Sequence, residues 1–336
     1  MVIIMSNNTV SKGFLAGMLK ALAADSAVIA PVRNGKVLEF LRISADSEIV
    51  MNDEIPYKSP KDAFFPQVEK LLTFKGGSVE ENAAVEKAVV FGVKPCDAEA
   101  LRVLYTVFTT GQFQDPFVKR RFENTVIIGV ACENEKPGCF CAQRGVDKSF
   151  TDFCDIMLNS SGEDGYSVEF LSKKGAELLG RFDETKDITP PAGRKAADPD
   201  PGVKMVELSP ELDEAALFDI IDWEQASQIC QGCGMCSFIC PTCHCFDIKD
   251  ATVHGETCRY RCWDSCMYPK FTLHASGHNP RNSAKERFRQ RVLHKYLYVG
   301  KNFGYTACTG CGRCIRSCPV GMNIKKVVES VMEVLP

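Results

Sequence analysis

The first part of the chain alternates patterns that are typical of helices and of buried strands. Ser11, a plausible N-cap, precedes a group of hydrophobic residues at helical spacing. These residues are Phe14, Leu15, Met18, Leu19 and Leu22. Two continuous apolar runs, 88–93 and 125–130, predict buried strands of a helix-covered sheet, and residues 98–108 between them predict a helix. This order indicates an α/β or α+β N-terminal domain.

The last part of the chain is predicted to be mostly α-helical. Ser209-Pro210 has the pattern of a cap and a first-turn proline and predicts a helix that runs to about Asp222. Ser283 begins a Ser-x-x-Glu capping box, and Asn323 is the expected cap of a final amphipathic helix.

A stretch rich in proline and glycine separates these two parts. Residues 187–202 contain four prolines and two glycines, a composition that favours neither helix nor strand. We therefore predict an α/β domain at 1–187, a linker or loop at 188–204 and a helical domain at 205–336.

Composition excludes several classes of protein. The 336 residues include 40 Lys and Arg against 43 Asp and Glu, a formal net charge of −3, which removes the strongest reason to expect a nucleic-acid partner. No apolar run approaches the ~18 residues that a membrane-spanning helix needs, so membrane insertion is not expected. The N-terminal segment does not have the pattern of a signal peptide, and we expect a cytoplasmic location.

The unusual feature of the composition is its 18 cysteines. Disulfides are rare in the reducing cytosol, and so many unprotected thiols would be prone to oxidation. The cysteines are also clustered along the chain, and none lies between Cys154 and Cys230. Thiolates bound to metal explain both the number and the clustering.

Two segments, 230–241 and 308–319, carry the same motif, C-x2-C-x2-C-x3-C-P. This motif is typical of [4Fe–4S] clusters, and in two-cluster proteins its fourth cysteine binds the other cluster. We predict a first [4Fe–4S] cluster on Cys230, Cys233, Cys236 and Cys318. We predict a second on Cys308, Cys311, Cys314 and Cys240.

Two other interpretations of these motifs are weaker. Zinc in C-x2-C knuckles does not explain two complete copies of the longer motif. Residues 240–244 match the C-x-x-C-H pattern of haem attachment, but a haem there would remove Cys240 from its cluster, and haem attachment normally requires export. His244 is then a hydrogen-bond donor near a cluster, or a surface residue.

A third cluster site is suggested by cysteines that follow the two predicted strands. Cys96 and Cys132 come after these strands, and Cys139 and Cys141 follow closely. If the strands are parallel, all four thiols reach one edge of the sheet, where they could bind a third [4Fe–4S] cluster or remain as buried reduced thiols. We expect Asp97 and the helix after it to favour the thiolate of Cys96.

Cysteines near the first motif form a further, weaker set. Cys243, Cys245 and Cys266 are candidates for binding iron in that third cluster or for supporting a cluster as neighbours. Cys258 and Cys262 belong to the same stretch without a recognisable motif.

Two other groups of residues allow a structural or a functional interpretation. His274 and His278 have the i, i+4 spacing of zinc helices, but the glycine and proline near them favour a structural loop. Residues 281–301 carry seven Arg and Lys against one Glu, which indicates either a solvated helix face or a docking patch for an acidic partner. The standard dinucleotide- and phosphate-binding motifs are absent, so we expect no flavin or nicotinamide on this chain.

Together with the two cluster motifs, five shorter segments make the chain resemble a known family. They are Gly92-Val-Lys-Pro-Cys96-Asp97, Gly138-Cys-Phe-Cys141, Cys240-Pro-Thr-Cys-His-Cys-Phe246, Trp263-Asp-Ser-Cys266 and Gly277-His-Asn-Pro-Arg281. The chain is similar to the dicluster iron–sulfur subunits that include the β subunit of cytosolic NiFe hydrogenases (sulfhydrogenases), the corresponding subunit of anaerobic sulfite reductase, and related subunits of flavin oxidoreductase–heterodisulfide reductase systems. The resemblance implies an electron-relay subunit between a ferredoxin-reductase-like subunit that binds flavin and NAD(P)H and a separate catalytic oxidoreductase subunit. It also strengthens the case for a third cluster at Cys96, Cys139 and Cys141.

The function that follows is transfer of single electrons through [4Fe–4S] clusters in anaerobic metabolism. We expect Arg313, Arg316 and Lys325 to raise the potential of the nearby cluster, because positive charge stabilises its reduced form. The alternatives are a self-contained iron–sulfur reductase of a sulfur substrate, and a structural zinc protein.

Overall fold

The computed structural model describes residues 9–82, 84–162, 164–182 and 203–335. Its larger sheet has seven strands, and the four central ones, β2, β6, β7 and β8, are parallel. In spatial order the strands are β1 (Thr9–Ser11), β9 (Gly165–Phe170), β8 (Ile156–Ser160), β7 (Thr125–Val130), β6 (Ala88–Val93), β2 (Ala27–Asn34) and β3 (Val37–Arg42). The two predicted strands are therefore neighbouring and parallel, with their carboxyl ends at the same edge.

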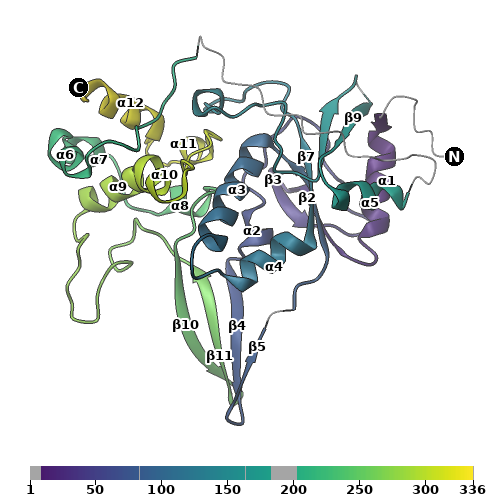
Figure 1. The fold of residues 1–336 in the computed structure, drawn as a ribbon, viewed down its shortest axis with the longest axis horizontal. Coiled ribbons are helices and arrows are strands. Elements are labelled where there is room, and N and C mark those ends of the chain that lie inside the picture. The colour runs from purple at the N-terminus through teal and green to yellow at the C-terminus, as the bar shows by residue number, and fades with distance from the viewer. Residues whose placement is uncertain (1–8, 83, 163, 183–202, 336) are drawn as a thin grey trace.

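Helices cover both faces of this sheet (Figure 1). One face packs against α1 (Lys12–Leu22) and α5 (Lys173–Gly180), and the other against α2 (Lys61–Phe64), α3 (Pro95–Thr109) and α4 (Pro116–Asn124). Val89 of β6 packs with the first group and Val90 with the second, as alternation along a strand requires. The predicted α/β architecture is confirmed, and Ser11 caps α1 by accepting a hydrogen bond from the Phe14 amide.

A bulge near the end of β6 sets the path into α3. Gly92 has a φ of +83°, and the register with β7 shifts between Phe91 and Val93. A Cβ on Gly92 would lie 2.7 Å from Pro31 Cγ, so only glycine fits here. Because of this bend, the chain enters α3 at the sheet edge with Cys96 in the first turn of the helix.

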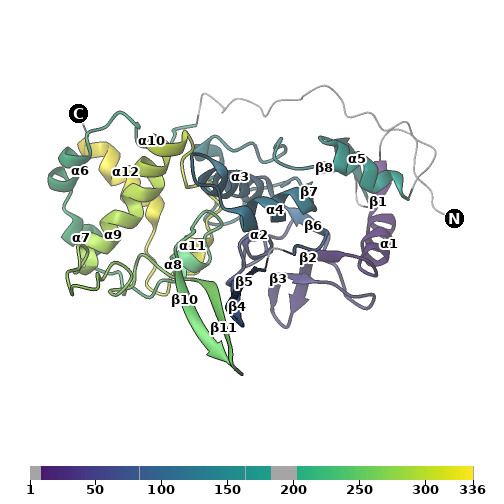
Figure 2. The same cartoon turned by 60° about the horizontal axis from the view of Figure 1, so that its bottom comes forward.

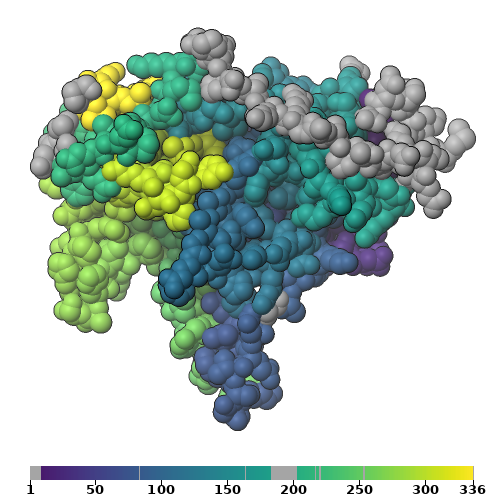
Figure 3. All heavy atoms as spheres, viewed as in Figure 1, coloured from purple at the N-terminus to yellow at the C-terminus, as the bar shows by residue number. Residues whose placement is uncertain are grey.

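A second, antiparallel sheet joins the two parts of the chain. Its order is β10 (Phe246–Val253), β11 (Glu256–Trp263), β4 (Val68–Lys75) and β5 (Ser78–Glu81). The two hairpins project from the body as a narrow finger (Figures 1, 2 and 3). The C-terminal part was predicted to be mostly α-helical, and it also contains this β10–β11 hairpin, whose strand β11 pairs with a strand from the N-terminal part.

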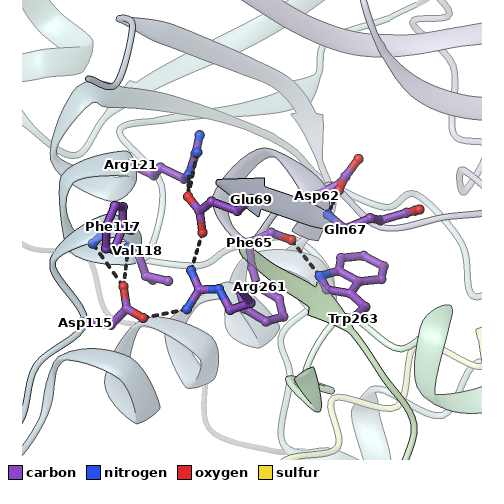
Figure 4. Close-up of polar contacts among 10 residues, drawn as sticks. All are labelled: Asp62, Phe65, Gln67, Glu69, Asp115, Phe117, Val118, Arg121, Arg261 and Trp263. Carbon is purple, nitrogen blue, oxygen red and sulfur yellow. Dashed lines mark hydrogen bonds and ion pairs between the residues drawn. The ribbon is translucent and has the colours of Figure 1, made fainter. Parts of the chain in front are cut away.

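A buried ion-pair network fixes this second sheet to α4 (Figure 4). Arg261 of β11 pairs with Glu69 of β4 and with Asp115, which also caps α4 through the amides of Phe117 and Val118. Arg121 of α4 completes the network by donating to Glu69 at 2.7 Å. Each of these charges is paired, which is the condition under which burial of a charge is tolerated.

The remaining helices form the C-terminal core. They are α6 (Glu214–Ile220), α7 (Trp223–Ser227), α8 (Met235–Phe238), α9 (Ala284–Leu293), a π-helix (His294–Tyr298), α10 (Val299–Phe303), α11 (Arg313–Arg316) and α12 (Ile324–Val334). The capping box at Ser283 and the cap at Asn323 are confirmed. None of the helices in the described ranges is both long and apolar enough to cross a membrane.

The helix predicted from Ser209-Pro210 to Asp222 is wrong in its start and extent. Asp213 caps α6 instead, because its carboxylate accepts a hydrogen bond from the Ala215 amide, whereas Ser209 accepts from Glu211 in a turn. Asp222 caps the separate helix α7. Most of the linker predicted at 188–204 lies outside the described residues, which omit 183–202.

Candidate metal centres

Four predicted ligands line one cavity at the C-terminal core. They are Cys230, Cys233, Cys236 and Cys318. Three come from the first repeat, on the loop before α8 and in α8 itself, and Cys318 comes from the second repeat after α11. This is the combination that the sequence predicts for the first cluster.

The other four line a second cavity. They are Cys240, Cys308, Cys311 and Cys314. Cys314 and Ile324 line both cavities, so the two lie side by side. Each cavity thus contains three cysteines of one repeat and the fourth cysteine of the other, and Cys314 also borders the first cavity.

Some buried polar atoms at these cavities have no hydrogen-bond partner, and they provide a test of whether the cavities fit an iron–sulfur cluster. In the part of the chain that the structure describes, Arg291 Nε and Nη2 at the first cavity and Thr309 Oγ1 at the second are buried without a hydrogen-bond partner. Buried donors are rarely left unsatisfied. A cluster with its four thiolates is an anion that offers sulfur acceptors, so these residues fit such a group.

Further donors already point at the cysteine sulfurs. Lys295 Nζ lies 3.0 Å from Cys240 Sγ, Tyr296 Oη donates to Cys308 Sγ at 3.2 Å, and the Met322 amide donates to Cys318 Sγ at 3.2 Å. Burial alone would lower the pKa of Lys295, but the thiolates of Cys240 and Cys243 raise it overall. Lys295 therefore stays cationic beside the second cavity.

Sequence analysis did not identify Arg291 and Lys295 as site residues. It assigned them to a surface, but Arg287, Arg291 and Lys295 are buried. The docking-patch interpretation of residues 281–301 is therefore wrong for these three. Their i, i+4, i+8 spacing beside the buried Phe288 and Val292 was a usable signal, because a cation on the apolar face of a helix needs a buried anion.

The candidate third site lies directly beside the second cavity. Cys96 and Cys141 are buried in one cluster with Cys311, and Cys139 Sγ lies 3.6 Å from Cys311 O. A Cβ on Gly310 would lie 2.6 Å from the Cys141 amide nitrogen, so the two cysteine loops are in backbone contact.

The pKa values of the thiols at this third site depend on burial and on the charges of their neighbours. Burial raises the pKa of Cys132 to about 11 and that of Cys141 to about 12, and the neighbouring Cys139 contributes to both shifts. Burial and the Asp97 carboxylate raise the pKa of Cys96, so the expectation that Asp97 favours its thiolate is wrong. Lys94 Nζ is buried nearby without a hydrogen-bond partner. Its positive charge opposes the effect of burial and lowers the pKa of Cys132.

Asp97 instead pairs with Arg313. The guanidinium contacts both carboxylate oxygens, at 2.5 and 2.8 Å, and donates to Pro56 O at 3.0 Å. This buried pair connects α3 with α11. The Asp97 carboxylate partly cancels the positive charge of Arg313, which the sequence analysis treated as unpaired.

The weaker cysteine candidates lie at different locations in the structure and do not form one site. Cys243 interacts with Cys240, whose thiol raises the pKa of Cys243, whereas Cys245 and Cys266 line a separate cavity of about 270 Å³. The Cys266 thiol lowers the pKa of Cys245 to about 7. Cys258 and Cys262 lie on β11.

Single-ion sites are not found among the described residues. No group of three or more His, Cys, Asp or Glu side chains there is arranged to hold one metal ion. His274 and His278 instead form a turn, in which the His274 amide donates to His278 O. In a cubane each thiolate binds a different iron atom, so its ligands need not converge on one point.

Comparisons with known proteins agree with the cysteine geometry. The model of the 4Fe-4S dicluster domain family matches residues 229–322. The chain is 30% identical over 314 residues to sulfhydrogenase 2 subunit beta of Pyrococcus furiosus, which covers 91% of this chain and 92% of that protein. No solved structure is significantly similar to the chain. The chain therefore belongs to the family of hydrogenase β-like dicluster iron–sulfur subunits.

Proposed function

We propose that the chain relays single electrons through two adjacent [4Fe–4S] clusters held by the predicted ligand sets. The observation that carries this proposal is the pair of neighbouring cavities, each lined by all four cysteines of one predicted set, with Cys314 of the second set lining both. A [4Fe–4S] cluster supplies one-electron redox chemistry when bound. Around each cavity, the residues of this chain hold the thiolates in place and set the local charge.

A third [4Fe–4S] cluster on Cys96, Cys132, Cys139 and Cys141 belongs to the same proposal. It is supported by the buried contact of Cys96 and Cys141 with Cys311 and by the buried Lys94 nearby, whose ammonium has no hydrogen bond and lies 3.6 Å from Asp53 Oδ1. The three sites then lie in a row, with the second cavity in the middle. A row of closely spaced sites suits electron transfer through the protein.

The position of the first cavity supports an exchange of electrons with other subunits. Cys233 is exposed, unlike Cys240 and Cys311 at the second cavity, which are buried. We propose two partners, a ferredoxin-reductase-like subunit that binds flavin and NAD(P)H, and a catalytic oxidoreductase subunit. This chain itself would bind neither flavin nor nicotinamide, and the complex would work in the cytoplasm.

Iron analysis and a redox titration test the proposal. Chain prepared anaerobically should contain about 12 iron atoms and as much acid-labile sulfide if three clusters are present, and about 8 if only the two dicluster motifs bind. Each cluster should take up one electron in a titration followed by electron paramagnetic resonance. Iron and sulfide near zero would contradict the relay and would leave a zinc protein as the alternative.

A self-contained reductase of a sulfur substrate is the second candidate function. The cavity with the thiol pair Cys245 and Cys266 favours it, because a substrate could reach thiols there. Turnover of such a substrate by the isolated chain with an artificial electron donor would support the reductase. Electron uptake without turnover would support the relay alone.

A further inference from the structure

Cys245 and Cys266 form a thiol pair that the two dicluster ligand sets do not use. Both side chains line the same cavity, and each thiol shifts the pKa of the other. The Asp264 amide donates to Cys245 O at 2.9 Å, which joins the segment that carries Cys245 to the segment that carries Cys266. This backbone contact holds the two thiols at one cavity.

The pair borders its own cavity of about 270 Å³. His244, Arg281, Gln290 and His294 supply its polar side chains, and Phe246 and Phe271 supply its aromatic ones. Arg281, Cys245 and Cys266 are partly exposed, so the cavity is accessible from solvent. This cavity is distinct from the two that the dicluster cysteines line.

The pair is also close to the proposed electron path. Cys266 packs against the same apolar core as Cys230 and Cys236 of the first cavity. The charge of Cys236 contributes to the raised pKa of Cys266. Cys243, two residues before Cys245, interacts with Cys240 of the second cavity. Electrons at either cavity would have only a short distance to travel to the pair.

We propose that Cys245 and Cys266 are a dithiol–disulfide couple that exchanges electrons with the neighbouring clusters, and that they are not iron ligands. This inference rests on the proposed relay function, because the clusters supply the electrons. The disulfide form accepts two electrons, one at a time, and two protons from solvent through the cavity. Its S–S bond breaks and two thiols form.

A small anionic disulfide is the class of oxidant that fits the cavity. The Cys245 thiolate attacks one sulfur of this molecule, forms a mixed disulfide and releases one thiolate. Cys266 then loses its proton and attacks Cys245 Sγ, which releases the second thiolate and closes the Cys245–Cys266 bond. The guanidinium of Arg281 favours a substrate with carboxylates.

Electron counting on the iron-loaded chain tests the couple. The protein is oxidised anaerobically with 3,3′-dithiodipropionate, freed of the reagent, and titrated with a low-potential reductant. Wild type should take up two electrons more than the Cys245→Ser/Cys266→Ser double variant at equal iron content, because the double variant can form neither the disulfide nor a mixed disulfide with the reagent at this pair. The matched control is Cys262→Ser on β11, which should take up as many electrons as wild type.

Peptide mass spectrometry after blocking of free thiols provides a second measurement. The oxidised wild type should contain a Cys245–Cys266 cross-link that disappears when the clusters are reduced. The Arg281→Met variant should form it several-fold more slowly with 3,3′-dithiodipropionate and faster with cystamine, a cationic disulfide of similar size, because the guanidinium attracts the first reagent and repels the second.

The outcomes separate this inference from the relay itself. Loss of about 4 iron atoms in both Cys245→Ser and Cys266→Ser would overturn the couple and make the two residues cluster ligands. Full iron content without a cross-link or extra electrons would overturn the couple and leave the relay intact. Absence of iron from wild type would instead contradict the relay.

Discussion

The two cysteine repeats have identical spacing, yet they occupy different surroundings. In the first repeat Cys233 is exposed and Met235 is 40% exposed. At the equivalent positions of the second repeat, Cys311 is 8% and Arg313 is 1% exposed. The spacing of a motif therefore determines which thiols line a cavity, whereas packing against α3 and the 138–141 loop determines what surrounds it.

The chemical consequence is a difference between the two proposed clusters. The first cavity borders solvent and has Arg291 as its buried cation. The second has Lys295 and Tyr296 on its sulfurs and is covered by the N-terminal part of the chain. Hydrogen bonds, net charge and exposure set cluster potentials, so the two clusters should differ in potential despite their identical motifs.

The largest expected effect is the loss of a whole cluster, and it tests the crossed ligand sets. Cys318→Ala should remove the same resonance signal as Cys230→Ala, although the two residues belong to different repeats. Cys240→Ala should remove the same signal as Cys308→Ala. Iron should fall by about 4 atoms in each variant. If Cys318→Ala and Cys308→Ala removed the same signal, each repeat would bind its own cluster.

A large effect on stability is expected at the buried position of the second repeat. Arg313→Met leaves the buried Asp97 carboxylate without its partner, which should cost about 3–5 kcal/mol of folding free energy. Met235→Ala, the equivalent position in the first repeat, should change it by only about 0.5 kcal/mol. Denaturant unfolding of the anaerobic protein, followed by cluster absorbance, compares the two.

A double variant identifies the cause of the Arg313 effect. Arg313→Met combined with Asp97→Leu removes both charges and should recover most of the lost stability. If the double variant were as unstable as Arg313→Met, packing and not the unpaired carboxylate would be responsible.

Removal of one buried cation should shift the reduction potential of one cluster more than that of the other. Lys295→Met should lower the potential of the second cluster, and Arg291→Met that of the first, because each cation favours the more negative reduced state. A shift on the order of 60 mV corresponds to a tenfold change in the ratio of reduced to oxidised cluster. Equal shifts of both clusters in both variants would show that the cavities share one electrostatic environment.

The smallest expected effect comes from a single neutral donor. Tyr296→Phe removes the hydroxyl that donates to Cys308 Sγ and should lower the potential of the second cluster by less than Lys295→Met does. The first cluster, which Tyr296 does not contact through a hydrogen bond, serves as the internal reference. The same redox titration measures both.

Local patterns in the sequence predicted much of this molecule. The strands at 88–93 and 125–130, the cap at Ser11 and the capping box at Ser283 depend on neighbouring residues, and each is confirmed. The crossed cysteine sets follow from motif spacing, and the cavities group the thiols accordingly.

Long-range pairing could not be read from the sequence in the same way. The β10–β11 hairpin was missed because its strands are mostly polar and one of its partners, β4, lies about 190 residues earlier. The role of Asp97 was misjudged for a similar reason, since its partner Arg313 is 216 positions away. The helix start predicted at Ser209-Pro210 was wrong because Asp213, four residues later, caps α6 instead.

The sheet that joins both parts also limits how this protein can be divided. A fragment that began near residue 205 would keep β10 and β11 but lose β4, and Arg261 would lose Glu69 and Asp115. The exposed edge of β11 would then be free to pair with other copies. The ferredoxin-type half is therefore not an interchangeable module, and gene fusions or shortened expression fragments should keep residues 68–75 with it.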